Sequence, residues 1–245
     1  MRVATKQLLP FTRKTLWAFN ELRSRSSSAE VCNLLERLNL NRDELVGKLA
    51  GELVKALNGL AVNLAGSGTA DPKEMEELNS RIAPLIDLLN TAPPRDYSLD
   101  RDVFYAALHK YSNGTYFHSE RVSESVEDIL EFMPYEYSQR KDLEIAARLH
   151  DIGKISVPRE ILNKPGSFDA AEKNIMNFHQ SIGFMLLRDI KRFRQIADIM
   201  SFTHIEQGYP AYLLGKPVPL LSHILIITDT WDACLCHREY RRGSS

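Results

Sequence analysis

The chain has 245 residues, of which 44% are hydrophobic and 26% charged, a composition typical of a globular protein with one domain or two small ones. Its 31 basic residues are balanced by 32 acidic ones, so the net charge of −1 excludes a polycationic surface for bulk nucleic acid. No apolar stretch approaches the ~20 residues of a membrane span, and Cys32, Cys234 and Cys236 do not suit a disulfide framework. We therefore expect a cytoplasmic protein with reduced thiols and no membrane segment.

The first predicted elements form a helical hairpin over residues 43–90. Leucines recur at helical spacing from Leu45 to Leu64, and a second apolar stripe follows the segment 66–74, which contains glycines and a proline. No polar residues suited to catalysis or ligand binding interrupt the stripes. We therefore expect them to pack in a core or in a dimer seam rather than to bind a ligand.

A linker or stiff corner is predicted at 91–98, because its two adjacent prolines cannot continue a helix. We place a domain boundary here, between an N-terminal helical region at 1–95 and a second domain at 96–245. The later chain lacks the alternation of a sheet, and the apolar run at 224–227 continues with helical character. The whole protein is therefore predicted to be α-helical.

Histidines gather in the second half of the chain, in polar or helix-end contexts. They are His118, His150, His179 and His204, and Asp229 follows them. Imidazole and carboxylate ligands together favour iron, manganese or zinc over magnesium or calcium. The distribution predicts a transition-metal site, although any one of these histidines alone would more often be a core or surface residue.

The strongest local signal is LEIAARLHDIGKISVP at 143–158. An apolar-faced helix brings His150 and Asp151 to its end, where Gly153 is expected to stop it. Asp151 can bridge two cations while His150 binds one, and Lys154 is near enough to offset the charge of a phosphate drawn to them. The alternative is a capping aspartate followed by a surface lysine.

Several motifs follow one another along the second half of the chain. They are HSERV (118–122), LHDIGKISVPREILNKPG (149–166), HQSIG (179–183), HIEQGYP (204–210), IITDTWDA (226–233) and REYR (238–241). Over about 115–242 this ordered series resembles the HD-GYP branch of the HD superfamily of metal-dependent phosphohydrolases. A match to the whole series in order is not expected by chance.

The resemblance implies an all-α, HD-type helical bundle that holds two divalent transition metals. These would be iron or manganese, with zinc and nickel as alternatives. The implied metal ligands are His118, His150, Asp151, His179, His204 and Asp229. Among them, Asp151 would bridge the two ions.

The resemblance also implies a substrate and a reaction. Lys154 would contact the scissile phosphate, and Arg238 and Arg241 would bind phosphates or bases, a task that suits the planar guanidinium. Tyr209 lies either near the substrate entrance or packed in its Gly-Pro turn. The implied reaction is hydrolysis of a cyclic dinucleotide in bacterial second-messenger signalling: cyclic di-GMP to pGpG or GMP, with cyclic GMP-AMP as an open alternative.

The chain departs from the family pattern at Thr203 and in the loop that follows it. Thr203 stands where the family has the first of two adjacent histidines, and the GYP loop that follows is shorter. Gly114 replaces a glutamate that accompanies a third metal in some members, so at most two metals are expected. One alternative is therefore a catalytically degenerate module that binds a nucleotide or a protein, and another is an HD phosphohydrolase for nucleotide monophosphates or polyphosphates.

Further residues have simpler interpretations. Asp232 lies three residues after Asp229 on the same helical face and either orients a ligand or makes an ordinary cap or ion pair. Arg121 likewise either supports a ligand or lies at the surface. The remaining histidines match no ligand position and are expected to be structural; they are His109, His223 and His237. The region 1–95 is expected to regulate the enzyme, through a homodimer of its helices or a signalling-protein partner.

Overall fold

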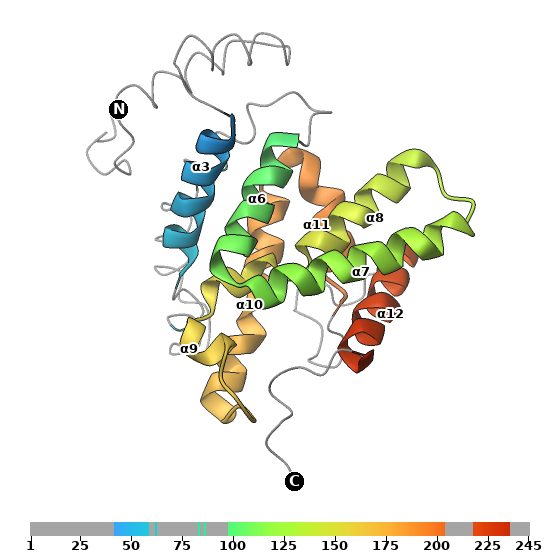
Figure 1. The fold of residues 1–245 in the computed structure, drawn as a ribbon. Helices are drawn as coiled ribbons and strands as arrows, with labels where there is room; N and C mark the ends of the chain where they lie inside the picture. Colours follow the sequence, from blue (N-terminus) through green and yellow to red (C-terminus); the bar gives the residue numbers. More distant parts are fainter. Residues whose placement is uncertain are drawn as a thin grey trace, which may run out of the picture.

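The computed structural model describes residues 42–58, 98–203 and 218–235, together with the single positions 62, 83 and 86. In these parts of the chain every regular element is helical, which confirms the predicted all-α fold (Figure 1). The α-helices are α3 (Arg42–Leu57), α6 (Ser98–Tyr111), α7 (Asn113–Glu131), α8 (Tyr137–Leu149), α9 (Arg159–Leu162), α10 (Ala170–Arg188), α11 (Arg194–Met200) and α12 (Leu220–Leu235). Two short 3-10 helices accompany them, η1 (Ile152–Ser156) and η2 (Lys191–Phe193).

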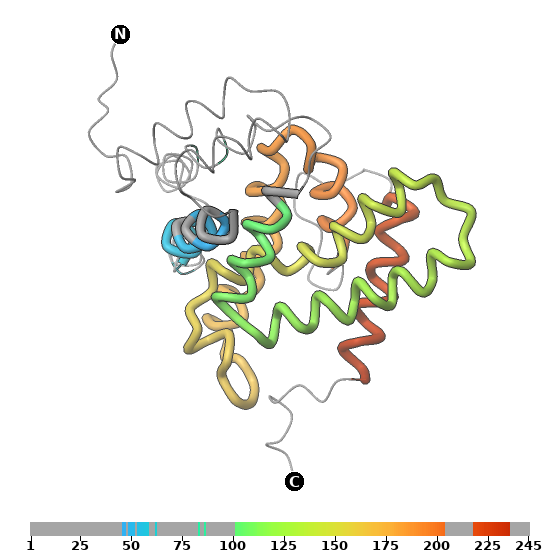
Figure 2. Tube along the Cα trace, turned by 45° about the horizontal axis from the view of Figure 1, so that its top comes forward, coloured from blue at the N-terminus to red at the C-terminus, as the bar shows by residue number. Residues whose placement is uncertain are grey.

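Helices α7 and α8 form an antiparallel pair, and α12 packs across both of them (Figures 1 and 2). Val122 and Val126 lie one turn apart on α7, so they share the helix face that is fully buried. Leu143 of α8 is fully buried in the same core. This packing holds in place the three helices that carry or directly precede four of the candidate ligands.

Two helix starts are set by side-chain caps. Ser112 has an extended backbone, and its hydroxyl accepts a hydrogen bond from the Thr115 amide at 3.2 Å, so α7 begins directly after α6 ends. Before α10, Asp169 and Glu172 form a capping box in which each carboxylate accepts a backbone N–H of the other residue at 2.9 Å. These caps place His118 and His179 at defined turns of their helices.

Helix α3 belongs to the same hydrophobic core as the later helices. Its Leu49, Leu53 and Leu57 are fully buried, and the helix packs along α6 (Figure 1). Core packing is therefore confirmed for this part of the first leucine stripe. Apart from positions 83 and 86, the second half of the predicted hairpin lies outside the described residues, as does the corner at 91–97, and the domain boundary stays a prediction.

The apolar run at 224–227 lies inside α12, as predicted from its helical continuation. Ile224 and Leu225 are buried, whereas Ile227 is 62% exposed, so the run covers both sides of the helix. Within the described parts of the chain, no helix has both the length and the apolarity that a bilayer crossing needs.

Candidate metal centre

The predicted ligands that the structure describes come from four different helices and meet at one place. They are His118 on α7, His150 and Asp151 at the end of α8, His179 on α10 and Asp229 on α12. All of them except His118 are buried. His150 directly follows the last turn of α8 and Asp151 precedes η1, so the change from an α-helix to a tighter 3-10 helix turns both side chains inward.

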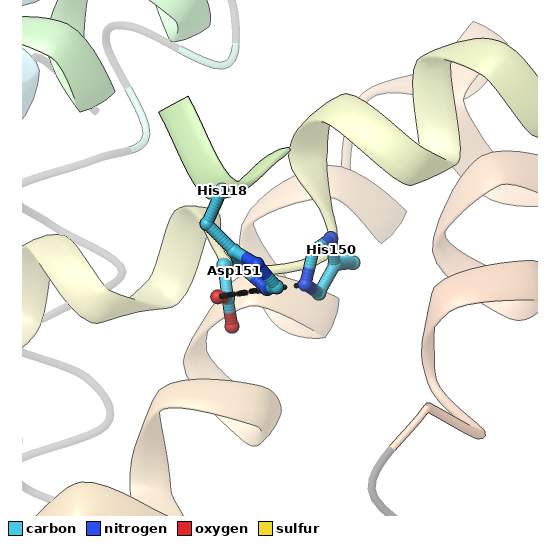
Figure 3. A group of neighbouring side chains, drawn as sticks. All are labelled: His118, His150 and Asp151. Atoms are coloured by element: carbon cyan, nitrogen blue, oxygen red, sulfur yellow. Dashed lines mark ion pairs between the residues drawn. The ribbon is translucent and has the colours of Figure 1, made fainter. Parts of the chain in front are cut away.

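Two imidazoles and two carboxylates face one common space. His118, His150 and Asp151 each offer one donor atom, and these atoms lie within 4.8 Å of one another (Figure 3). The Asp151 Oδ2 lies 3.4 Å from Nε2 of His150 and 3.8 Å from Nε2 of His118. The Asp229 Oδ1 lies 3.0 Å and 3.7 Å from the Nε2 atoms of His118 and His150, respectively, which completes the group.

The second oxygen of Asp151 faces a different histidine. Its Oδ1 lies 3.5 Å from Nε2 of His179, while its Oδ2 faces the group formed with His118 and His150. One carboxylate thus presents its two oxygens to two separate sets of nitrogen donors. This is the arrangement that a carboxylate needs in order to bridge two cations.

Each of the three histidines is held through its other ring nitrogen. Nδ1 of His150 donates to the Ala147 carbonyl at 2.7 Å, and Nδ1 of His179 donates to the Met176 carbonyl. A carbonyl oxygen only accepts, so Nδ1 carries the proton in both rings and Nε2 is turned toward the carboxylates. These backbone acceptors, three residues earlier on each helix, were not predicted from the sequence.

The third histidine is held by a side chain. Asp232 Oδ2 accepts a hydrogen bond from Nδ1 of His118 at 2.6 Å, and Arg121 donates to both oxygens of the same carboxylate, at 2.7 and 3.0 Å. Partial burial works to raise the pKa of Asp232, but the bonds from Arg121 and His118 outweigh it and lower the pKa to about 2. Of the two interpretations of Asp232, the contact with His118 is that of a residue orienting a ligand.

The charges of the centre are strongly coupled. Burial works to raise the pKa of Asp151, but Lys154 and His150 outweigh it and hold the pKa well below its usual range. Burial works to lower the pKa of His150, but Asp151 and then Asp229 outweigh it and raise the pKa to about 9. The carboxylates therefore create a negative environment that favours a cation, either a proton on His150 or a metal ion.

Two glycines allow α10 to approach η1 closely. A Cβ on Gly153 would lie 1.7 Å from the carbonyl oxygen of His179 and 2.8 Å from the backbone nitrogen of Gly183. The prediction that Gly153 stops the preceding helix is wrong, because α8 already ends at Leu149 and Gly153 lies inside η1. The role of Gly183 was not predicted, although it lies one turn after His179 on the same face of α10.

Lys154 lies at the edge of the centre. Its ammonium group contacts Oδ2 of Asp151 at 2.5 Å, and the side chain remains 15% exposed. The interpretation of Lys154 as an isolated surface lysine is thereby excluded. The lysine is close enough to the candidate metal ligands to interact with an anion bound beside them.

Thr203 does not point its hydroxyl proton into the centre. The residue is buried, and its Oγ1 donates to the Met200 carbonyl at 2.7 Å. The other predicted site residues lie outside the described residues; they are His204, Tyr209, Arg238 and Arg241. His109 and His223 are exposed, and His109 packs edge-on against Tyr116 at 4.8 Å between ring centroids.

The donors present fit a divalent transition metal. Imidazole nitrogens and carboxylate oxygens lie ~2.1 Å from such an ion, so two neighbouring donors of one ion are about 3.0–3.5 Å apart. The measured separations around Asp151 Oδ2 and Asp229 Oδ1, from 3.0 to 3.8 Å, are close to this range. The nitrogen-containing donor set is also the one that transition metals prefer over magnesium or calcium.

Comparisons with known proteins agree with this geometry. A family model described as "HD domain" matches residues 102–245, which is more than half of the chain. The chain therefore belongs to the HD domain family, and the resemblance to its HD-GYP branch is confirmed by the relatives that it matches. Divalent metal binding is implied for a domain of this family.

Three relatives illustrate the similarity. The cyclic di-GMP phosphodiesterase response regulator RpfG of Xanthomonas campestris is 34% identical over 142 residues, covering 56% of this chain and 38% of that protein. The 3'3'-cGAMP-specific phosphodiesterase 2 of Vibrio cholerae is 33% identical over 162 residues, covering 64% and 30%. A cyclic di-GMP phosphodiesterase of Thermotoga maritima is 36% identical over 132 residues, covering 52% and 36%.

The matched region spans about a third of the length of these curated relatives. No solved structure shows a significant match to the chain.

Proposed function

We propose that the protein is a metal-dependent phosphodiesterase that hydrolyses a cyclic dinucleotide. The relatives named above act on cyclic di-GMP or 3'3'-cGAMP, and cyclic di-GMP is the substrate that we favour, opened to pGpG or cut onward to GMP. The observation that carries the proposal is the orientation of Asp151, whose two oxygens face two sets of histidines. A dinuclear centre of this kind is suited to phosphodiester hydrolysis.

The proposed ligands divide into two positions. His118, His150 and Asp229 would hold one ion together with Asp151, and His179 and His204 would hold the second ion, which Asp151 would also contact. Iron and manganese are the metals that we expect, with zinc and nickel as alternatives. When bound, such ions act as Lewis acids that activate water and stabilise the charge on the reacting phosphate.

The substrate would be held by cationic and aromatic side chains at the edge of this centre. Lys154 is our candidate for contact with the scissile phosphate, because its ammonium group lies beside Asp151 and is partly exposed. Arg238 and Arg241 would bind the other phosphate or the bases, and Tyr209 would lie at the entrance. These last roles rest on the motifs alone, since the three residues are outside the described parts.

A second candidate function is a catalytically degenerate HD-GYP module that binds a nucleotide or a protein partner. The hydroxyl of Thr203 favours it, because its proton is directed to the Met200 carbonyl where the family has a histidine ligand. In that case the position shared by Asp151 and His179 would hold its ion weakly. Binding of cyclic di-GMP without turnover is the result that this alternative predicts.

We place the activity in the cytoplasm, since Cys234 is a free thiol and the other two cysteines form no recognisable disulfide pattern. The region 1–95 would act as a regulatory or dimerising module, through a homodimer or a signalling-protein partner. The buried leucines of α3 pack within the chain, so a dimer would use other faces of this region.

The experiment that tests the proposal compares two histidine variants of the full chain. His150→Ala removes a buried donor, whereas His223→Ala removes an exposed imidazole on α12 and serves as the matched control. We expect His150→Ala to abolish both metal content and hydrolysis of cyclic di-GMP under added Mn²⁺ or Fe²⁺, and His223→Ala to retain both. Unchanged metal content in His150→Ala would contradict the proposed site. If the metal-loaded wild type did not hydrolyse cyclic di-GMP, the proposed activity would be contradicted.

A further inference from the structure

The end of α3 lies close to the segment that carries Asp151 and Lys154. Helix α3 packs along α6 (Figure 1) and also contacts η1. Its last turn ends at Leu57, and Asn58 follows, held by its backbone N–H to the Val54 carbonyl at 2.9 Å. A helix from the N-terminal region therefore contacts η1, the segment that follows Asp151 and contains Lys154.

Tyr111, the last residue of α6, joins the two segments. Its hydroxyl lies 2.5 Å from the Val157 carbonyl oxygen and 3.0 Å from Oδ1 of the Asn58 side chain. Both of these oxygens only accept, and a phenol has one proton, so the Tyr111 hydroxyl donates to one of the two oxygens at a time. The hydroxyl thus connects two segments that are 99 residues apart in the sequence (58 to 157).

Val157 in turn fixes η1. Its N–H donates to the Lys154 carbonyl at 3.1 Å, and the Lys154 N–H donates to the Asp151 carbonyl at 2.9 Å. The Lys154 side chain then contacts the Asp151 carboxylate. A displacement of Val157 would therefore move the backbone that orients both Lys154 and Asp151.

Tyr111 is itself held in place from the other side. The guanidinium of Arg159 lies 4.9 Å from the centre of the Tyr111 ring, and the same side chain donates to the Lys110 carbonyl at 2.9 Å. Tyr111 is only 5% exposed. The hydroxyl is therefore constrained to the position between Asn58 and Val157.

We propose that Tyr111 is a positioning residue for Asp151 and Lys154, and that it links helix α3 of the N-terminal region to the metal centre. The effect of Tyr111 on turnover rests on the proposed function. The effect of Tyr111 on metal binding does not depend on the substrate. A change in α3 would reach the centre through Asn58, the Tyr111 hydroxyl and the Val157 carbonyl.

The test uses Tyr111→Phe in the full chain, which removes the hydroxyl and keeps the ring under Arg159. We expect Mn²⁺ affinity, measured by titration calorimetry, to fall by about tenfold, the lower end of what loss of a group supporting metal ligands produces. The kcat for cyclic di-GMP should fall while KM changes little, because Tyr111 does not contact the substrate. Asn58→Ala should weaken Mn²⁺ binding by less, and adding it to Tyr111→Phe should have no further effect.

Two controls separate positioning from a general loss of stability. Leu130→Ala removes a buried side chain at the far end of α7 and should lower the melting temperature without changing Mn²⁺ affinity. Tyr137→Phe removes an exposed hydroxyl and should change neither the melting temperature nor the Mn²⁺ affinity.

Wild-type Mn²⁺ affinity in Tyr111→Phe, with only a lower melting temperature, would overturn the proposal. So would additive effects of the two substitutions on Mn²⁺ binding. If the wild type binds Mn²⁺ but does not hydrolyse a cyclic dinucleotide, the proposed function fails, and the Mn²⁺ affinities of the same variants still decide the role of Tyr111.

Discussion

At the scale of single residues, the geometry of the centre depends on the hydrogen-bond acceptor that holds the Nδ1 atom of each imidazole. Three ring nitrogens face the carboxylates because the other nitrogen of each ring is bonded to a fixed acceptor. Two of these acceptors are backbone carbonyls that no side-chain substitution can remove. The acceptor for His118 is the Asp232 carboxylate, which Arg121 also holds, so this is the contact that mutation can test.

We predict that Asp232→Asn weakens metal binding by about 10- to 100-fold, because the neutral amide cannot orient His118 and satisfy Arg121 as the carboxylate does. The measurement is Mn²⁺ affinity of the full chain. Asp128→Asn, which changes an exposed carboxylate on α7, is the matched control and should bind Mn²⁺ as the wild type does. Equal affinity of the two variants would show that Asp232 does not support His118.

Thr203 allows a second prediction at this scale. Because its hydroxyl donates to the Met200 carbonyl, replacing it by the similarly shaped valine should leave the number of bound metal ions unchanged. The variant is expected to lose some stability, since the Met200 carbonyl loses a partner. Elemental analysis of Thr203→Val checks the prediction, and loss of a metal ion would mean that the Thr203 oxygen is a ligand.

At the scale of secondary-structure elements, the decisive feature is the close approach of α10 to η1. This approach brings His179 to the second oxygen of Asp151, and it is possible only because Gly153 lacks a side chain at the contact. The nearest atoms to Gly153 are backbone atoms, which cannot move aside as a flexible side chain would.

Gly153→Ala should therefore separate α10 from η1 and abolish metal binding by the chain, with a large loss of thermal stability. The matched control is Gly47→Ala on α3, where an added methyl group meets nothing within 4 Å. There the gain in helix propensity should stabilise the protein by about 0.5–1 kcal/mol. Thermal melting and metal content of the two variants check this, and a Gly153→Ala protein with normal metal content would contradict it.

The elements themselves were largely predictable from local patterns. The apolar spacing before His150 predicted a helix that brings His150 and Asp151 to its end, and the first leucine stripe predicted α3 with its buried face. The role of Gly153 was not predictable, because its neighbour is the backbone of His179, distant in sequence, and a glycine near a helix end ordinarily indicates a C-cap. Tyr111 was missed for the same reason, since its partners are Asn58 and Val157.

At the scale of the whole molecule, the candidate centre is assembled from helices α7, α8, α10 and α12, which are distributed over residues 113–235. Sequence motifs named the candidate ligands, but only the packing of these helices assigns the two oxygens of Asp151 to different histidines. Helix α3 shares the same core, so the N-terminal region is in physical contact with the domain that carries the centre.

Bridging of two metal ions by Asp151 is tested most directly by electron paramagnetic resonance of the full chain saturated with Mn²⁺. Two ions sharing one carboxylate are expected to give a spin-coupled spectrum, which Asp151→Asn should convert to that of isolated Mn²⁺ or abolish. A spectrum of isolated Mn²⁺ alone in the wild type at saturation would contradict the bridging role of Asp151.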